Sequence, residues 1–180
     1  MRILIASDIH GAERPASKIA EAAAKRDVEL ILLLGDLLYH GPRNDLPATY
    51  APKRVIEILT GLKDRIIAVR GNCEAEVDQM VLPFPCMADS NTLIADGLKI
   101  FMTHGHIWNY DRHPWEIDVF MQGHTHIQHL AKKDGIIYLN PGSVSIPKGG
   151  NRPSYAFWNG KTIEIIDLDS EETIHSIDIC

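Results

Sequence analysis

The sequence has few of the features that a secreted protein requires. It contains only three cysteines in 180 residues, Cys73, Cys86 and Cys180, and no Cys-x-x-Cys pair. An odd number of isolated cysteines offers no disulfide framework, so we expect a reducing compartment, the cytoplasm. The N-terminal apolar stretch ends at Ser7 and Asp8, which is too short for a signal peptide.

Long apolar runs and an excess of positive charge are also missing. The longest uninterrupted apolar run, residues 30–34, is as long as a strand, whereas a membrane span needs about 20 apolar residues. The formal net charge is −6, which argues against general binding to a nucleic-acid backbone. A phosphate-containing substrate stays open, because bound divalent cations would reverse the local sign of the charge.

The sequence does contain enough apolar residues, 45%, for one sizeable core, so we expect one domain over residues 1–180. In the first half, apolar strand-like runs alternate with helix-like segments. This order predicts right-handed crossovers and a parallel sheet. The expected strands are 2–6, 30–34 and 65–69, and the expected helices are 15–26, beginning at Pro15, and 51–62.

The second half has the pattern of hairpins. Asp96-Gly97, Asp134-Gly135 and Asn159-Gly160 each separate two apolar runs, and such dipeptides favour tight turns between antiparallel strands. Together the two halves predict two packed sheets flanked by helices. The expected strands of the second half are 98–103, 118–121, 136–139, 154–158, 162–167 and 173–179.

Five short motifs contain most of the residues with functional chemistry. They supply carboxylates, imidazoles and one amide, which together are suited to binding two divalent metal ions. All five contain a glycine beside the candidate ligand, and most follow an apolar run. The motifs are Asp8-Ile9-His10-Gly11, Gly35-Asp36, Gly71-Asn72, His104-Gly105-His106 and Gly123-His124-Thr125-His126.

The expected strands bring these motifs together. Asp8, Asp36 and Asn72 each follow one of the three predicted parallel strands, and ligands of α/β sheets gather at the carboxyl ends of such strands. Asp36 is central in this order, so its carboxylate is suited to bridging two cations. Oxygen and imidazole ligands without thiolate are suited to Mn, Fe, Co, Ni or Zn and do not select one of them.

In this order, the motifs resemble those of the calcineurin-like metallophosphoesterases, and in particular the small YfcE-type phosphodiesterases of bacteria. The family pattern of D-x-H, G-D, G-N, H and G-H-x-H covers residues 8–126, and the strings at 36–52, 70–80 and 140–150 resemble the YfcE subgroup itself. The resemblance implies a four-layer αββα sandwich, with two mixed sheets flanked by helices. It also implies a metal-dependent phosphodiesterase that hydrolyses small phosphodiesters, with a metal-bridging hydroxide attacking phosphorus.

The resemblance further assigns two sets of metal ligands that share Asp36. Two divalent transition metal ions are implied, with Mn²⁺ favoured and Ni, Co, Fe and Zn as alternatives. Asn72, His104 and Cys73 are the candidate catalytic residues. The first metal would be bound by Asp8, His10, Asp36 and His126, and the second by Asp36, Asn72, His104 and His124.

Cys73 departs from the general family, which often has a histidine at this position to protonate the leaving group. A thiol with an ordinary pKa of about 8.5 is a poorer proton donor at neutral pH than an imidazolium. An acid role for Cys73 is therefore in doubt. His40 and His106 are candidates for assistance, and Arg43 or Arg70 for binding a phosphoryl oxygen.

Two other functions use the same residues. A nuclease or nucleotide phosphatase would share the metal site, but the acidic charge argues against a nucleic-acid partner. A non-catalytic scaffold, like the retromer subunit of this fold, need not keep every ligand. The sequence favours a small phosphodiester substrate and no membrane partner, and it leaves homo-oligomer formation open. The turn at residues 140–143 either supports the metal site or only reverses the chain.

Overall fold

The computed structural model describes residues 1–114 and 116–179, so Trp115 and Cys180 lie outside the described part. Strands and helices alternate in the first half, and the three strands there pair in parallel, as the sequence predicts. The elements are β1 (Ile3–Ala6), α1 (Glu13–Lys25), β2 (Leu30–Leu33), α2 (Pro52–Thr60), a short 3-10 turn (Lys63–Arg65) and β3 (Ile66–Ala68).

The expected start of the first helix at Pro15 is wrong, because α1 begins at Glu13. The N–H groups of the first helical turn have no partner within the helix, so a proline there removes no hydrogen bond. Pro15 therefore lies inside the first turn of α1. Pro52, by contrast, is the first residue of α2, as its sequence position suggested.

The second half contains the expected hairpins, but its strands also pair in parallel. The turns at Asp96-Gly97, Asp134-Gly135 and Asn159-Gly160 join antiparallel strands, which confirms the three hairpins. β5, β6 and β8 are parallel to one another, so the hairpin interpretation was incomplete. The elements are α3 (Glu76–Val81), β4 (Ser90–Ala95), β5 (Leu98–Thr103), β6 (Val119–Met121), β7 (Gln128–Lys133), β8 (Ile136–Pro141), β9 (Ser154–Trp158), β10 (Thr162–Asp167) and β11 (Thr173–Asp178).

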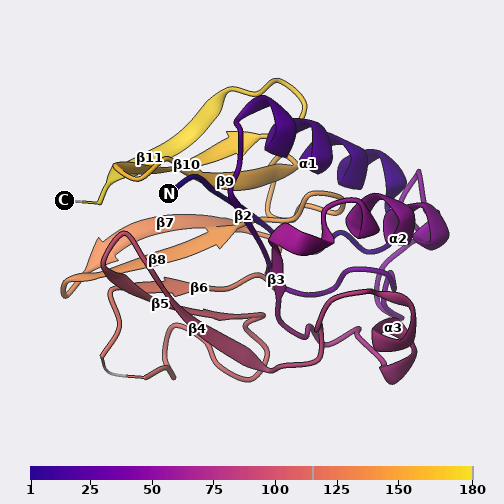
Figure 1. The fold of residues 1–180 in the computed structure, drawn as a ribbon, viewed down its shortest axis with the longest axis horizontal. Coiled ribbons are helices and arrows are strands. Elements are labelled where there is room, and N and C mark those ends of the chain that lie inside the picture. The colour runs from indigo at the N-terminus through magenta and orange to yellow at the C-terminus, as the bar shows by residue number, and fades with distance from the viewer. Residues whose placement is uncertain (115, 180) are drawn as a thin grey trace.

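Two mixed sheets pack face to face (Figure 1), which confirms the predicted sheet architecture. The six-stranded sheet has the order β11-β10-β9-β1-β2-β3, and the five-stranded sheet the order β4-β5-β6-β8-β7. Fully buried side chains such as Ile5, Leu32, Met102 and Trp158 fill the space between them. Each large buried aliphatic side chain contributes about 1.5–3 kcal/mol, so this interface fixes the relative position of the two sheets.

The outer faces of the two sheets are covered differently. α1 and α2 pack their apolar side chains on the six-stranded sheet. On the five-stranded sheet, Phe101 and Phe120 pack against Trp108 and Tyr110 of the connection between β5 and β6. Within the described residues, this fourth layer is therefore a loop with an aromatic cluster rather than a helix. In the same part of the chain, no helix has both the length and the apolar character needed to span a membrane.

Candidate metal centre

The predicted ligands follow strands of both sheets. Asp8 follows β1, Asp36 follows β2 and Asn72 follows β3, which are parallel neighbours in the six-stranded sheet. His104 follows β5, and the last motif with His124 follows β6, which are parallel neighbours in the five-stranded sheet. The site thus lies where the carboxyl ends of parallel strands from the two sheets meet.

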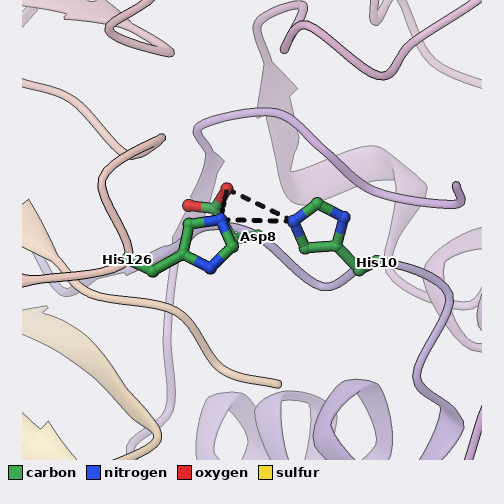
Figure 2. A group of neighbouring side chains, drawn as sticks. All are labelled: Asp8, His10 and His126. Atoms are coloured by element: carbon green, nitrogen blue, oxygen red, sulfur yellow. Dashed lines mark hydrogen bonds and ion pairs between the residues drawn. The ribbon is translucent and has the colours of Figure 1, made fainter. Parts of the chain in front are cut away.

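Asp8, His10 and His126 form a first cluster of ligand atoms (Figure 2). Asp8 Oδ1 lies 3.6 Å from His10 Nε2 and 3.2 Å from His126 Nε2. All three side chains are buried. The cluster therefore presents one carboxylate and two imidazoles to a common point, as a transition-metal site requires.

Asp8, Asp36 and His104 form a second cluster. Asp36 Oδ2 lies 3.4 Å from His104 Nε2, and it also lies 3.6 Å from Nε2 of His10 in the first cluster. Asn72 Oδ1 lies 3.2 Å from His104 Nε2. Because Asp36 contacts one histidine of each cluster, its carboxylate lies where a bridging ligand would be needed.

His124 lies beside the second cluster. Its ring centroid is 5.1 Å from that of His104, and its backbone N–H donates to Asp8 Oδ2 at 3.1 Å. The loop approaches Asp8 this closely because residue 123 is glycine, where a Cβ would overlap Ser7 Oγ. The seven predicted ligands therefore lie around one site, but within the described residues His124 is not among those whose ligand atoms converge within 4.8 Å.

Hydrogen bonds to backbone carbonyls fix the orientation of three histidines. Nδ1 of His10 contacts the carbonyl of Tyr39 at 2.8 Å, and Nδ1 of His126 contacts that of Ile146 at 2.7 Å. His104 Nδ1 contacts a third carbonyl, that of residue 34, at 2.6 Å. A carbonyl only accepts, so each Nδ1 carries the proton and each neutral ring presents its Nε2 lone pair to the centre. This is how proteins orient metal-binding imidazoles.

The donor set fits a cation. Asp8 Oδ1 is buried and has no hydrogen-bond partner within the described residues, although it faces His10 and His126. A buried carboxylate oxygen without a partner is costly, and a metal ion at this point would satisfy it together with the two Nε2 lone pairs. The residues therefore fit the divalent metal ions that the sequence implied.

The backbone at the ligands is strained in a consistent way. Asp8, His10, Asp36, His124 and His126 all have positive φ angles, between 49° and 67°. Non-glycine residues rarely adopt this left-handed conformation, and such strain is stored mainly at functional sites. Each ligand thus turns away from the direction of its strand and toward the centre.

Carboxylates and imidazoles at the centre shift one another's pKa. Burial alone would raise the pKa of Asp8, but its contacts with His10 and His126 lower that pKa well below the usual range. Burial also disfavours the charge of His104, but Asp36 and Asp8 outweigh it and raise the pKa of His104 to about 9. The metal-free site therefore keeps ionised carboxylates that attract positive charge.

The turn at residues 140–143 is hydrogen-bonded to two of the candidate ligand motifs, which favours the supporting role over the simple chain reversal. The hydroxyls of Ser143 and Ser145 both donate to the backbone carbonyl of Asp8 at 2.8 Å. Asn140 donates from Nδ2 to the carbonyl of Gly123 at 2.8 Å. These bonds fix the turns that present the first and last motifs.

Glu74 is a supporting residue that the sequence analysis missed. Its carboxylate accepts hydrogen bonds from the backbone N–H groups of Asp36, Leu37 and Gly71. It therefore ties the turn after β2 to the turn after β3. Burial, with the nearby charge of Asp36, raises the pKa of Glu74 to about 7. The signal available in the sequence was a carboxylate two residues after the third motif.

A small cleft of about 30 Å³ opens in front of the ligands. Arg43 and Lys148 line it together with Asp36, Asn72 and His124. Both cations are exposed, so they are available to an anionic group in the cleft. Arg43 was one of two arginines suggested by the sequence, whereas Lys148 was not singled out.

The other candidates lie in different surroundings. Arg70 forms an ion pair with Asp89 at 2.7 Å and is not among the residues that line the cleft. His40 packs its ring between two tyrosine rings. His106 lies beside the second cluster, with its ring centroid 5.4 Å from that of His104. Of the candidate helpers, Arg43 therefore has the most direct access to the cleft.

Cys73 lies next to the centre. Its Sγ is within 4.8 Å of ligand atoms of His10 and Asp36, and its backbone N–H donates to Asp36 Oδ1 at 2.8 Å. Burial, together with the charge of Asp36, raises the pKa of the thiol well above its usual range. A thiol that binds its proton this tightly is a poor acid, so these surroundings do not support an acid role for Cys73.

Comparisons with known proteins agree with this geometry. The model of the calcineurin-like phosphoesterase superfamily domain matches residues 1–162. The phosphodiesterase YfcE of Escherichia coli (strain K12) is 40% identical over 181 aligned positions, which cover 99% of this chain and 98% of YfcE. A solved structure of YfcE, described as a phosphoesterase from E. coli, superposes with a TM-score of 0.97 and covers all of both chains.

The fold also extends to more distant proteins. Vacuolar protein sorting 29 from Cryptosporidium parvum superposes with a TM-score of 0.67 at 18% identity, covering 98% of this chain and 97% of that one. That similarity shows the fold alone. The family match spans most of the chain, and the similarity to YfcE spans nearly all of it. The chain therefore belongs to the calcineurin-like phosphoesterase superfamily.

Proposed function

We propose that this chain is a metal-dependent phosphodiesterase that hydrolyses small phosphodiesters at the centre formed by its seven predicted ligands. The observation that carries the proposal is the position of Asp36, whose carboxylate contacts His10 and His104 of the two clusters. The similarity to a protein named a phosphodiesterase over the whole chain supports a diester as substrate.

In this proposal, Asp8, His10, Asp36 and His126 hold one divalent ion, and Asp36, Asn72, His104 and His124 hold the second. When bound, such ions supply positive charge that polarises a phosphoryl group and lowers the pKa of a water molecule. We propose Mn²⁺ as the native metal and the cytoplasm as the compartment. The nitrogen and oxygen donors, without a thiolate ligand, support Mn²⁺ but do not exclude its neighbours.

The protein's own residues then position the substrate. Arg43 and Lys148 at the rim of the cleft balance the negative charge of the phosphate. Asn72, which is exposed in the cleft, would donate from Nδ2 to a phosphoryl oxygen, while its Oδ1 faces Nε2 of His104 and is available to the second ion. Neither step needs a proton from Cys73, which favours substrates with good leaving groups.

The test is hydrolysis of bis(p-nitrophenyl) phosphate by metal-free protein to which Mn²⁺, Ni²⁺, Co²⁺, Fe²⁺, Zn²⁺ or Mg²⁺ is added. We expect turnover with a transition metal and a lower kcat/KM for p-nitrophenyl phosphate. Preferred cleavage of single-stranded DNA or of a nucleoside monophosphate would support the nuclease or nucleotidase alternative. Stoichiometric metal binding without any turnover would support the scaffold.

A further inference from the structure

A groove of about 350 Å³ lies beside the metal cleft, between the connection after β2, the start of α2, and α3. Figure 1 shows α2 and α3 at the same end of the molecule. We call this cavity the α3 groove. Lys53 and Asp78 are the charged residues of its lining. The apolar residues of the lining are Leu38, Tyr39, Tyr50, Pro52, Ile56, Ala75, Val77 and Val81.

Three of these apolar side chains are exposed to solvent. The exposed fractions are 42% for Tyr39, 57% for Val77 and 45% for Val81. Val77 and Val81 are four residues apart in α3, so they lie on one face of the helix. Apolar side chains gathered around a concave surface indicate a binding site rather than chance exposure.

The α3 groove adjoins the metal cleft at one shared residue. Cys73 lines both cavities, and its Sγ lies within 4.8 Å of ligand atoms of His10 and Asp36. Tyr39 lines the groove, while its backbone carbonyl accepts the hydrogen bond from His10 Nδ1. The groove therefore begins on the far side of Cys73 from the metal cleft, where an ester arm that passes Cys73 would reach it.

The two cavities differ in size and in chemistry. The cleft of about 30 Å³, with Arg43 and Lys148 at its rim, is too small to hold the ester arms of a diester. The groove is about ten times larger and mainly apolar. A phosphodiester carries two such arms, so at least one apolar arm has a place to bind beyond Cys73.

We propose that the α3 groove binds an apolar ester arm of the substrate, an aryl or medium-length alkyl group, while the phosphoryl group lies in the metal cleft. This inference rests on the proposed function, and it names the substrate class as phosphodiesters with at least one apolar arm. Val77 and its neighbours in the groove are then specificity-determining residues.

Binding of non-hydrolysable n-alkylphosphonates tests the proposal without relying on turnover. Methyl-, butyl- and hexylphosphonate are titrated by calorimetry into the Mn²⁺-loaded protein. Each methylene group that enters an apolar groove should tighten binding about two- to fourfold. Hexylphosphonate should therefore bind more than tenfold more tightly than methylphosphonate, and it should compete with bis(p-nitrophenyl) phosphate.

Two substitutions on the same helix provide a matched pair. Val77→Asp adds a charge inside the groove and should abolish the increase in affinity with the length of the alkyl chain. Methylphosphonate has almost no alkyl chain, so its affinity reports any effect of the substitution on binding of the phosphonate group itself. Met80→Asp adds the same charge to α3 at a side chain that is 82% exposed and does not line the groove. It should keep the full chain-length dependence. Thermal unfolding of both variants checks that each is folded.

Three outcomes would overturn the proposal or separate it from the proposed function. Equal affinity for all three phosphonates would refute the α3 groove, even if diesters are hydrolysed. A change of oligomeric state in Val77→Asp, measured by light scattering, would assign this face to a second copy of the chain instead. Tight binding of hexylphosphonate without hydrolysis of any diester would refute the catalytic proposal but would support apolar binding in the α3 groove.

Discussion

The Nε2 atoms of His10 and His126 face each other at 3.4 Å, although the two residues lie 116 positions apart in the chain. Both rings carry their proton on Nδ1 when neutral, because each Nδ1 contacts a backbone carbonyl. Neither Nε2 then has a proton to give the other, and Asp8 Oδ1 lies beside both. A cation bound between them would accept the two Nε2 lone pairs and balance the charge of the Asp8 carboxylate. This supports a native site that contains metal.

Activity should accordingly depend on a transition metal. Treatment with EDTA should abolish hydrolysis of bis(p-nitrophenyl) phosphate, and Mn²⁺, or a neighbour such as Ni²⁺ or Co²⁺, should restore it. Metal content is measured by elemental analysis alongside the rate. Full turnover in a preparation shown to contain no metal would refute the proposed mechanism.

Asp36→Asn should be among the most damaging single substitutions. The change removes the negative charge that lies between His10 and His104. Changes around metal ligands already cost about 10–100-fold, so a ligand to both ions should cost more than about 100-fold in kcat. His129→Ala, at an exposed position, is the control and should be close to neutral. If Asp36→Asn still binds two equivalents of metal and keeps near-normal turnover, Asp36 is not a ligand to both ions.

Metal binding and stability should respond to pH in opposite directions. The folded, metal-free protein raises the pKa of His104 from 6.5 to about 9, and that of His10 in the same direction. At a pH between 6.5 and about 9, His104 keeps a proton in the folded state that it has lost in the unfolded state. The free energy of unfolding therefore falls as pH rises through this range. Metal must displace the same proton, so its affinity rises over that window.

The measurement is thermal unfolding with and without Mn²⁺ from about pH 6.5 to pH 9, the window set by the pKa of His104. The Tm of the metal-free protein should fall with pH, and the increase in Tm on adding Mn²⁺ should grow. His104→Asn, which cannot titrate at this position, should weaken both trends, whereas His129→Ala should keep them. A metal-induced increase in Tm that is constant across the window would contradict the assignment of His104.

Glu74→Ala should destabilise the protein by releasing the turns that present Asp36 and Asn72. It leaves the buried N–H groups of Asp36, Leu37 and Gly71 without their acceptor. Each hydrogen bond to a carboxylate contributes about 1.5–3 kcal/mol to the free energy of unfolding. Water can replace part of these bonds in the variant, so we expect the free energy of unfolding to fall by about 2–4 kcal/mol. Denaturant unfolding measures it, with Glu76→Ala on the exposed side of α3 as control. Equal stability of the two variants would show that Glu74 does not tie the turns together.

The difference between Asp36 and Glu74 explains how far sequence alone could predict this site. Asp36 belongs to a glycine-containing motif after an apolar run, so its position at a strand end follows from local pattern. Glu74 acts through backbone N–H groups of residues 36, 37 and 71, which have no sequence signal. In the same way, Ser143 and Ser145 reach the carbonyl of Asp8 only once the two sheets are packed.

The elements that were missed are short or exposed. α3 has only six residues, so it shows no helical period that a sequence window would detect. β4 and β7 lie at the edges of the five-stranded sheet and expose many of their side chains. Their apolar pattern is therefore weak, although the turn dipeptides Asp96-Gly97 and Asp134-Gly135 marked where each one ends.

The substitution Cys73→His tests what residue 73 contributes to substrate choice. The thiol sits beside His10 and Asp36, and burial keeps its pKa well above the usual range, so it donates a proton poorly. Diesters with a good leaving group need little proton donation, whereas monoesters of poor leaving groups need more. The wild-type protein should therefore prefer bis(p-nitrophenyl) phosphate to an alkyl phosphate monoester, whose alkoxide is a poor leaving group.

An imidazole at position 73 should raise monoester turnover relative to diester turnover. A well-placed general acid contributes about 10²–10⁴-fold, so even a poorly oriented one should shift the ratio measurably. The comparison needs kcat/KM for both esters in wild type and Cys73→His at matched metal content, with Cys73→Ser as the variant that removes the thiol without adding an imidazole. If the ratio stays the same in all three proteins, residue 73 does not govern leaving-group protonation. Substrate choice would then lie elsewhere, in the loop of residues 37–50, which contributes Arg43 to the lining of the cleft.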